Sequence, residues 1–175
     1  MTGQVVTRAL PATEERASAD ARMRALLSRP DPGPVAEHLA LLHFTGRRSG
    51  RPYVVPAGVH LLGGGLVVAT GSGWRRNFAG GTDGELTWRG TRAAVRFTLL
   101  TDPDRIAAGY LELYERYGTE AGPRRLGLAV AEGRMPDLAD FRTAVDRCGF
   151  ALVDVMTFAA AHAMTTPRTN EGTSR

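Results

Sequence analysis

The fold is decided by residues 39–62, which read LALLHFTGRRSGRPYVVPAGVHLL. Apolar runs over residues 39–45 and 53–62 flank the polar, glycine-bounded segment GRRSG at residues 46–50. A connection of this length between two apolar runs predicts a β-hairpin. Pro56 lies inside the second run and has no backbone N–H, so it indicates a strand edge or a β-bulge.

Similar patterns continue along the chain. Further strands are predicted over residues 66–70, 85–89, 92–100 and 150–158, with turns at residues 63–65 and at Gly90. Helices are predicted over residues 13–29, 103–117, 123–131 and 137–147, with Asp102 capping the second and Pro103 opening it. Five or six antiparallel strands with a helical insertion before the last favour an α+β fold, a small β-barrel with flanking helices, because closure removes exposed sheet edges.

The length of the chain, 175 residues, fits one domain with a sizeable core. We expect residues 12–164 to form this domain. Residues 1–11 are expected to be unstructured, and the polar tail at residues 165–175 is expected to be disordered.

Arginine supplies all of the basic charge, with 22 arginines, no lysine and a net charge of +4. The absence of lysine excludes a Schiff-base enzyme and a P-loop. The one cysteine, Cys148, excludes an intrachain disulfide and a multi-cysteine metal site, and the four histidines lack metal-ligand spacing. Few aromatic residues and no continuous arginine stripe argue against nucleic-acid binding. Neither a membrane-spanning run nor a secretory signal layout is present, so we expect a cytoplasmic protein.

Residues 38–82 carry positive charge that no carboxylate in the same segment compensates, and we call this segment the arginine window. It holds five arginines and no Asp or Glu, while all 18 carboxylates lie elsewhere. The arginines belong to two glycine-bearing signals, TGRRSGRP at residues 45–52 and GSGWRRN at residues 71–77. Backbone N–H groups freed by glycine and forked guanidinium groups both suit phosphate or carboxylate oxygens. The arginine window therefore predicts an anionic ligand, although arginines on a hairpin can also simply keep a surface loop soluble.

These motifs, together with VVP at residues 54–56 and WRRNF at residues 74–78, resemble the deazaflavin-dependent nitroreductase family. The resemblance covers about residues 39–100. It implies the split β-barrel fold that this family shares with pyridoxamine-phosphate oxidases. It also implies that the reduced 8-hydroxy-5-deazaflavin coenzyme, F420, acts as a hydride donor.

The resemblance implies a set of cofactor-binding residues. In the resembled family, one loop holds the phosphate and the glutamate tail of the coenzyme. The residues of this chain that match that loop are Arg47, Arg48, Ser49, Gly50 and Arg51. The strand whose backbone lies against the deazaflavin ring matches Val55, Pro56, Ala57 and Gly58. The loop on the phosphate side matches Thr70, Gly71, Ser72 and Gly73, and the helix start after it matches Trp74, Arg75, Arg76 and Asn77. Trp74 is also a natural core anchor for that helix.

Tyr110, Tyr114 and Tyr117 recur at helical spacing on one face of the predicted helix over residues 103–117. Periodicity alone indicates core packing. Relatives in the resembled family place aromatic residues from this region over the ring, which makes Tyr114 and Tyr117 candidate catalytic residues. His43 and His60 fall on predicted strands and are interpreted as structural.

The sequence thus favours an oxidoreductase that passes a hydride from a reduced deazaflavin to a small electrophile such as a nitroaromatic, a quinone or an enone. Two alternatives stay open. One is an FMN-dependent oxidoreductase on the same barrel, and the other is a non-catalytic barrel that binds a coenzyme or another small ligand. Relatives with this fold are often dimers, which leaves a homodimer open.

Overall fold

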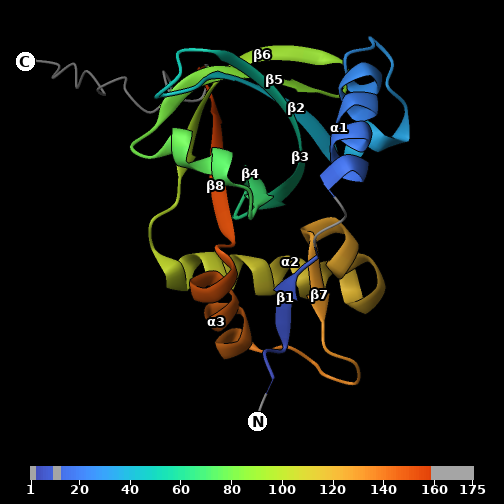
Figure 1. Cartoon of the computed structure of the whole chain (residues 1–175), viewed down its shortest axis with the longest axis vertical. Coiled ribbons are helices and arrows are strands. Elements are labelled where there is room, and N and C mark those ends of the chain that lie inside the picture. Colours follow the sequence, from blue (N-terminus) through green and yellow to red (C-terminus); the bar gives the residue numbers. More distant parts are fainter. Residues whose placement is uncertain (1–2, 10–12, 159–175) are drawn as a thin grey trace, which may run out of the picture.

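The computed structural model describes residues 3–9 and 13–158, and six of its strands close into an antiparallel β-barrel (Figure 1). The barrel strands are β2 (Leu39–Thr45), β3 (Pro52–Leu62), β4 (Gly65–Thr70), β5 (Thr82–Trp88), β6 (Thr91–Leu99) and β8 (Ala151–Thr157). Their order around the barrel is β2-β3-β4-β8-β6-β5. The predicted α+β class, a small antiparallel barrel with flanking helices, is confirmed.

The β2–β3 hairpin runs in one unbroken register from Leu39↔Gly58 to Thr45↔Pro52. On its other side β3 pairs with β4 only over the stretch from Val59 to Leu62. Among the described strands, residues 52–58 of β3 therefore have a neighbour on one side only. This confirms the edge position predicted for Pro56, where no ladder hydrogen bond is lost.

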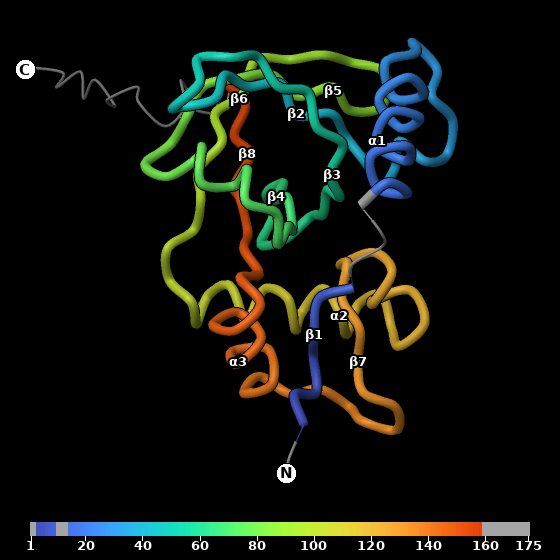
Figure 2. The backbone as a smooth tube through the Cα atoms, viewed as in Figure 1, coloured from blue at the N-terminus to red at the C-terminus, as the bar shows by residue number. Residues whose placement is uncertain are grey.

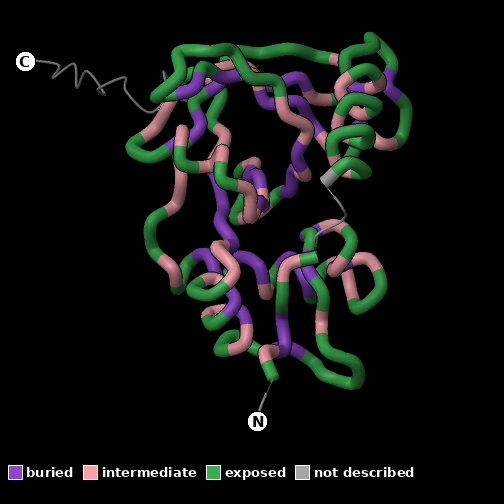
Figure 3. The backbone as a smooth tube through the Cα atoms, in the orientation of Figure 1, coloured by how far each residue is buried: buried purple, intermediate pink, exposed green. Residues whose placement is uncertain are grey.

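The barrel interior is filled by alternating apolar side chains from all six strands. Val95 and Phe97 of β6 point inward beside Val153 of β8, and each is nearly inaccessible to solvent. In Figure 3 the same alternation appears as buried and exposed segments that succeed each other along the strands. This core holds the barrel closed, so its loops are carried on a rigid support.

A second layer lies against one end of the barrel (Figure 2). It contains the helices α2 (Pro103–Leu126) and α3 (Leu138–Cys148) and the small antiparallel sheet of β1 (Val6–Arg8) and β7 (Leu128–Val130). As predicted, Asp102 caps α2, and its side chain accepts a hydrogen bond from the N–H of Asp104 at 3.0 Å. Tyr110, Leu113 and Phe141 lie in the core between this layer and the barrel.

Two predictions about this layer are wrong. Residues 1–11 are not entirely unstructured, because β1 lies within them, pairs with β7 and buries Val6 completely. The helix predicted over residues 123–131 ends at Leu126. There Gly127 adopts a left-handed conformation and the chain enters β7. The predicted tail at residues 165–175 lies outside the described residues.

Helix α1 (Thr13–Leu27) packs against β2 and β3, and two short 3₁₀ helices, η1 (Pro34–Glu37) and η2 (Gly73–Phe78), complete the fold. Leu27 of α1 contacts Ala36 and Leu41 in a third, smaller core. Within the described residues, no helix combines the length and the apolar character needed to cross a membrane.

Candidate functional site

The loop between β2 and β3 folds tightly on itself. Gly46 donates its N–H to the carbonyl of Arg51 at 2.9 Å, and Gly50 donates to the carbonyl of Gly46 at 2.9 Å. A Cβ at position 46 would lie 2.6 Å from Oγ of Ser49 and 2.7 Å from the ring of Tyr53, so any larger residue there would force both side chains to move. The compact backbone projects the exposed Arg47 and Arg48 side chains outward.

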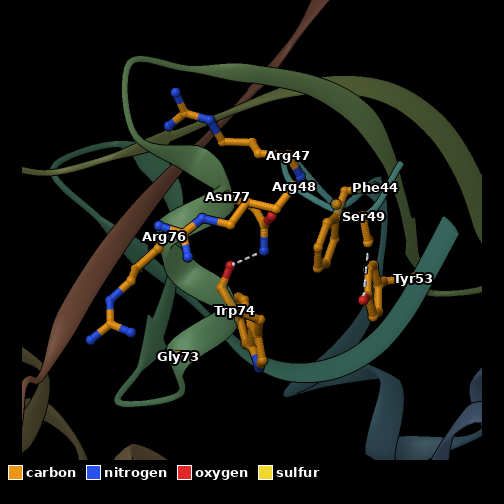
Figure 4. Close-up of a pocket in the computed structure, with 10 residues that line it drawn as sticks. Phe44, Arg47, Arg48, Ser49, Tyr53, Gly73, Trp74, Arg76 and Asn77 are labelled. Atoms are coloured by element: carbon orange, nitrogen blue, oxygen red, sulfur yellow. Dashed lines mark hydrogen bonds between the residues drawn. The ribbon is translucent and has the colours of Figure 1, made fainter. Parts of the chain in front are cut away.

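Hydrogen bonds join this loop to η2, so the two signals of the arginine window lie side by side. The N–H of Arg47 donates to Oδ1 of Asn77 at 2.9 Å, and the Arg47 guanidinium donates to the carbonyl of Ala79 at 3.2 Å. Nδ2 of Asn77 in turn donates to the carbonyl of Trp74 at 2.8 Å (Figure 4). Asn77 is thus the link between two segments that are about 30 residues apart in the chain.

These segments enclose a pocket of about 920 Å³, which we call the loop pocket. Its base is aromatic. The Phe44 and Tyr53 rings stack with centroids 5.6 Å apart, and Trp74 lies 6.3 Å from Phe44 (Figure 4). Its cationic residues are Arg47, Arg48 and Arg76. An aromatic floor beside three guanidinium groups suits a ligand that is partly planar and partly anionic.

A second pocket of about 640 Å³, the strand pocket, adjoins the first and shares Gly73 and Trp74 with it. One side is the free edge of β3, residues 55–58, and the facing side is the loop at residues 70–73. Helix α1 and residues 124–127 at the end of α2 complete the lining. We call the two pockets together the groove.

The groove carries strong positive charge. Of the residues that the structure describes, seven arginines line the groove, against a single carboxylate, Asp20. The seven are Arg8, Arg16, Arg47, Arg48, Arg76, Arg124 and Arg125. Across the described residues, the ion pairs involve Arg89, Arg92, Arg96, Arg116 and Arg142, and none involves an arginine of the groove. The groove arginines therefore remain available to an anionic ligand.

The groove brings together most of the predicted cofactor-binding residues. Val55, Pro56, Ala57, Gly58, Thr70, Gly71 and Ser72 line the strand pocket, Arg47, Arg48, Ser49, Arg76 and Asn77 line the loop pocket, and Gly73 and Trp74 line both. A Cβ at Gly73 would have a single neighbour within 4 Å, Nη1 of Arg76 at 3.9 Å. The backbone at Gly73 is thus open to close approach from the groove.

Three predicted residues do not line the groove. Gly50 and Arg51 lie on the exposed side of the hairpin loop, where the N–H of Arg51 donates to Oγ of Ser49 at 3.2 Å. Arg75 turns inward, and its Nη1 donates to the carbonyls of Gly71 and Ser72 at 3.3 and 2.9 Å. Burial lowers the pKa of Arg75, with Arg76 and Arg8 adding to the effect. Arg75 shapes the loop instead of facing a ligand.

The predicted catalytic tyrosines also lie elsewhere. Tyr114 is only 3% exposed and packs in the helical-layer core, with its ring 5.8 Å from that of Phe141. Its expected position over a coenzyme ring is therefore wrong. Tyr117 lies behind the strand pocket, where its hydroxyl is hydrogen-bonded to Nδ1 of His60 at 2.7 Å. The Tyr117 ring contacts the guanidinium of Arg125 at 3.7 Å.

Four groove arginines lie outside the arginine window and were not predicted: Arg8, Arg16, Arg124 and Arg125. Arg8 reaches the groove because β1 pairs with β7, and its Nη2 donates to Oγ of Ser72 at 3.2 Å. The adjacent pair Arg124–Arg125, at the start of the helix predicted over residues 123–131, is a local signal that could have suggested a cationic site there.

No protein-family model matches the chain, and no curated protein matches it. It is similar to a pyridoxamine 5'-phosphate oxidase-related, FMN-binding protein from Nostoc punctiforme, with 18% identity and a TM-score of 0.43 over 85% of this chain and 83% of that one. It is also similar to ChuZ of Campylobacter jejuni, with 12% identity and a TM-score of 0.37 over 85% of this chain. The match spans about 55% of the ChuZ chain.

Proposed function

We propose that this protein is an oxidoreductase that holds a reduced deazaflavin coenzyme in the groove and passes its hydride to a small electrophilic acceptor. The observation that carries the proposal is the charge of the groove, seven arginines against one aspartate, beside the free edge of β3. A deazaflavin coenzyme of the F420 type combines a planar ring with a phosphate and several carboxylates. The arginines of the groove match the phosphate and the carboxylates, and the free edge of β3 matches the planar ring.

The residues present fit such a coenzyme in two places. Arg47, Arg48 and Arg76 would hold the phosphate and carboxylate groups in the loop pocket through charge-assisted hydrogen bonds. The backbone of residues 55–58 would lie against the ring, because no strand pairs with that edge among the described residues. Trp74 lies where the two pockets meet and would separate the ring from the anionic tail.

When bound, the coenzyme supplies the hydride, so the protein contributes position, charge and exclusion of water. Arg75 keeps the loop at residues 70–73 in shape through its two carbonyl contacts. Asn77 holds the hairpin loop against η2 and so fixes Arg47 relative to Trp74. This rigidity limits the entropy that binding removes from the groove.

FMN is the second candidate coenzyme. FMN has one phosphate and no carboxylates, so it would engage fewer of the seven groove arginines than a coenzyme with a polyglutamate tail. The number of cations therefore favours the deazaflavin. A protein that binds either coenzyme without turning over any acceptor would instead be a non-catalytic carrier.

The test is a substitution in the loop pocket. The double variant Arg47→Gln/Arg48→Gln should bind the oxidised deazaflavin coenzyme at least about tenfold more weakly, because hydrogen bonds to charged groups contribute about 1.5–3 kcal/mol each. Fluorescence titration measures the affinity. Arg92→Gln is the matched control, since Arg92 is paired with Glu85 outside the groove. Equal affinity of the double variant and the wild type would refute the proposed site.

A further inference from the structure

The groove holds more positive charge than the proposed coenzyme engages. The three arginines of the loop pocket are assigned to the phosphate and carboxylate groups of the coenzyme. The strand pocket is lined by four others, which are Arg8, Arg16, Arg124 and Arg125. We call these four residues the strand-pocket arginines. The proposed coenzyme site leaves them without a ligand.

The loop pocket and the end of α2 lie at opposite ends of one stretch of β3. Tyr53 lines the loop pocket, and residues 55–58 line the strand pocket. A Cβ at Gly58 would lie 3.5 Å from the carbonyl oxygen of Arg125, so the end of α2 lies close against β3 there. Five residues of a strand span about 17 Å. Because a coenzyme of the F420 type carries its anionic groups on a single chain, a chain that runs from the ring to the loop pocket leaves the strand-pocket arginines free.

The small β1–β7 sheet helps to bring the strand-pocket arginines together. Arg8 lies on β1, and the residue that follows it donates its N–H to the carbonyl of Gly127, directly after α2, at 3.1 Å. Arg8 therefore lies beside the end of α2, where Arg124 is found. Helix α1 packs against β3 and adds Arg16 from a third segment.

The strand-pocket arginines are available to a ligand. Across the described residues, the side chains of Arg16 and Arg124 make neither an ion pair nor a hydrogen bond. Nη2 of Arg8 donates to Oγ of Ser72 at 3.2 Å, which holds that guanidinium in place. Asp20 is the one described carboxylate of the strand pocket, so three of its four positive charges remain uncompensated. A ligand with a negative group would reduce the repulsion among them.

We propose that the hydride acceptor is itself an anion, namely a nitroaromatic, a quinone or an enone that carries a carboxylate group. This inference rests on the proposed function. The electrophilic group of the acceptor would lie over the coenzyme ring beside residues 55–58. Its carboxylate would accept charge-assisted hydrogen bonds from the strand-pocket arginines, chiefly Arg16 and Arg124.

The carboxylate takes no part in the reaction. In a nitroaromatic acid, the nitro group takes up the hydride and one proton from the solvent. One N–O bond breaks, its oxygen leaves as water, and a nitroso group remains. The acceptor thereby gains the two electrons that the coenzyme loses. The strand-pocket arginines therefore position the acceptor, and their removal should act on its KM more than on kcat.

Para-nitrobenzoate and its neutral methyl ester are matched probes for this site. Isothermal titration calorimetry, with and without the oxidised coenzyme, should show that the acid binds at least about tenfold more tightly than the ester. The variant Arg16→Gln/Arg124→Gln should remove this preference. Arg105→Gln, at an exposed arginine of α2 outside the groove, should retain it. Equal binding of acid and ester by the wild type would overturn the proposal.

A second measurement separates the acceptor site from the coenzyme site. Arg16→Gln/Arg124→Gln should weaken binding of the oxidised coenzyme less than about threefold, because only long-range attraction is lost. If it weakens the coenzyme as much as Arg47→Gln/Arg48→Gln does, the strand-pocket arginines hold the coenzyme and the acceptor proposal fails. If the preference for the acid depends on Arg16 and Arg124 but the reduced coenzyme reduces neither probe, the anion site is supported and the oxidoreductase function fails.

Discussion

Among the described residues that line the groove, Asp20 is the single carboxylate, and it lines the strand pocket together with four of the seven arginines. Its side chain belongs to α1, which covers the strand pocket on one side. A negative charge here opposes an anionic ligand, but it also limits mutual repulsion among the arginines. At the scale of single residues, Asp20 therefore adjusts how strongly the groove attracts anions.

Asp20→Asn should tighten binding of the deazaflavin coenzyme about two- to fivefold, because one repulsive charge near the ligand contributes on the order of 0.5–1 kcal/mol at partly solvated sites. Glu14→Gln removes the same charge from the exposed side of α1 and should leave the affinity unchanged. Fluorescence titration of both variants measures this difference. Equal effects of the two substitutions would show that net charge matters and position does not.

At the scale of elements, the contact between β3 and α2 depends on a buried titratable group. His60 of β3 is hydrogen-bonded to Tyr117 of α2, whose ring carries Arg125. Among the causes that lower the pKa of His60 to about 4, burial is the largest. The folded protein therefore binds fewer protons at this position than the unfolded chain between about pH 4 and the ordinary pKa of 6.5.

The contribution of the neutral, buried His60 to the free energy of unfolding is therefore fully present above pH 6.5. It is lost as the pH falls from 6.5 to about 4. The difference of about 2.5 pKa units corresponds to roughly 3 kcal/mol as an upper estimate. Urea unfolding at pH 7 and pH 4.5 should show a steep loss for the wild type and a smaller one for His60→Gln. An identical loss in His60→Gln would contradict this account.

The small β1–β7 sheet is the other element-scale feature with a measurable effect. Val6 is completely buried between β7 and the helical layer, whereas its neighbour Thr7 is exposed. Val6→Ala should lower the free energy of unfolding by about 2 kcal/mol, from lost apolar burial and the cavity that remains. Thr7→Ala should change it by less than about 0.5 kcal/mol. Urea unfolding of the two variants measures these changes. If Val6→Ala left the free energy of unfolding unchanged, β1 would not contribute to the stability of the folded state.

Sequence reasoning located the barrel because its signals are local. Residues 39–45 form an apolar run that ends in a glycine-bounded loop, and the observed β2 has the same bounds as the prediction. β1 and β7 have three residues each and lie about 120 positions apart, so no local pattern indicates their pairing. For the same reason the place of Arg8 in the groove could not be predicted, because Arg8 reaches the groove only through that pairing. The inward turn of Arg75 was equally invisible, since it depends on carbonyls exposed by the folded loop.

For the whole molecule, the central feature is the groove, whose two adjoining pockets share Gly73 and Trp74 and lie beside the aromatic cluster and the free edge of β3, with arginines lining both. Four chain segments supply these arginines: β1, α1, the arginine window and the end of α2. Such a convergence of cations gives a long-range attraction for polyanions that salt screens. A coenzyme with many negative charges should therefore show a stronger salt dependence than FMN.

The measurement that tests this account most directly is a fluorescence titration of the wild-type protein with the oxidised deazaflavin coenzyme, with FMN run in parallel at low and high salt. The account predicts saturable deazaflavin binding that weakens markedly with salt, and FMN binding that is weaker at low salt. Tight FMN binding with no affinity for the deazaflavin would contradict the assigned coenzyme. Binding of neither would contradict the coenzyme site itself.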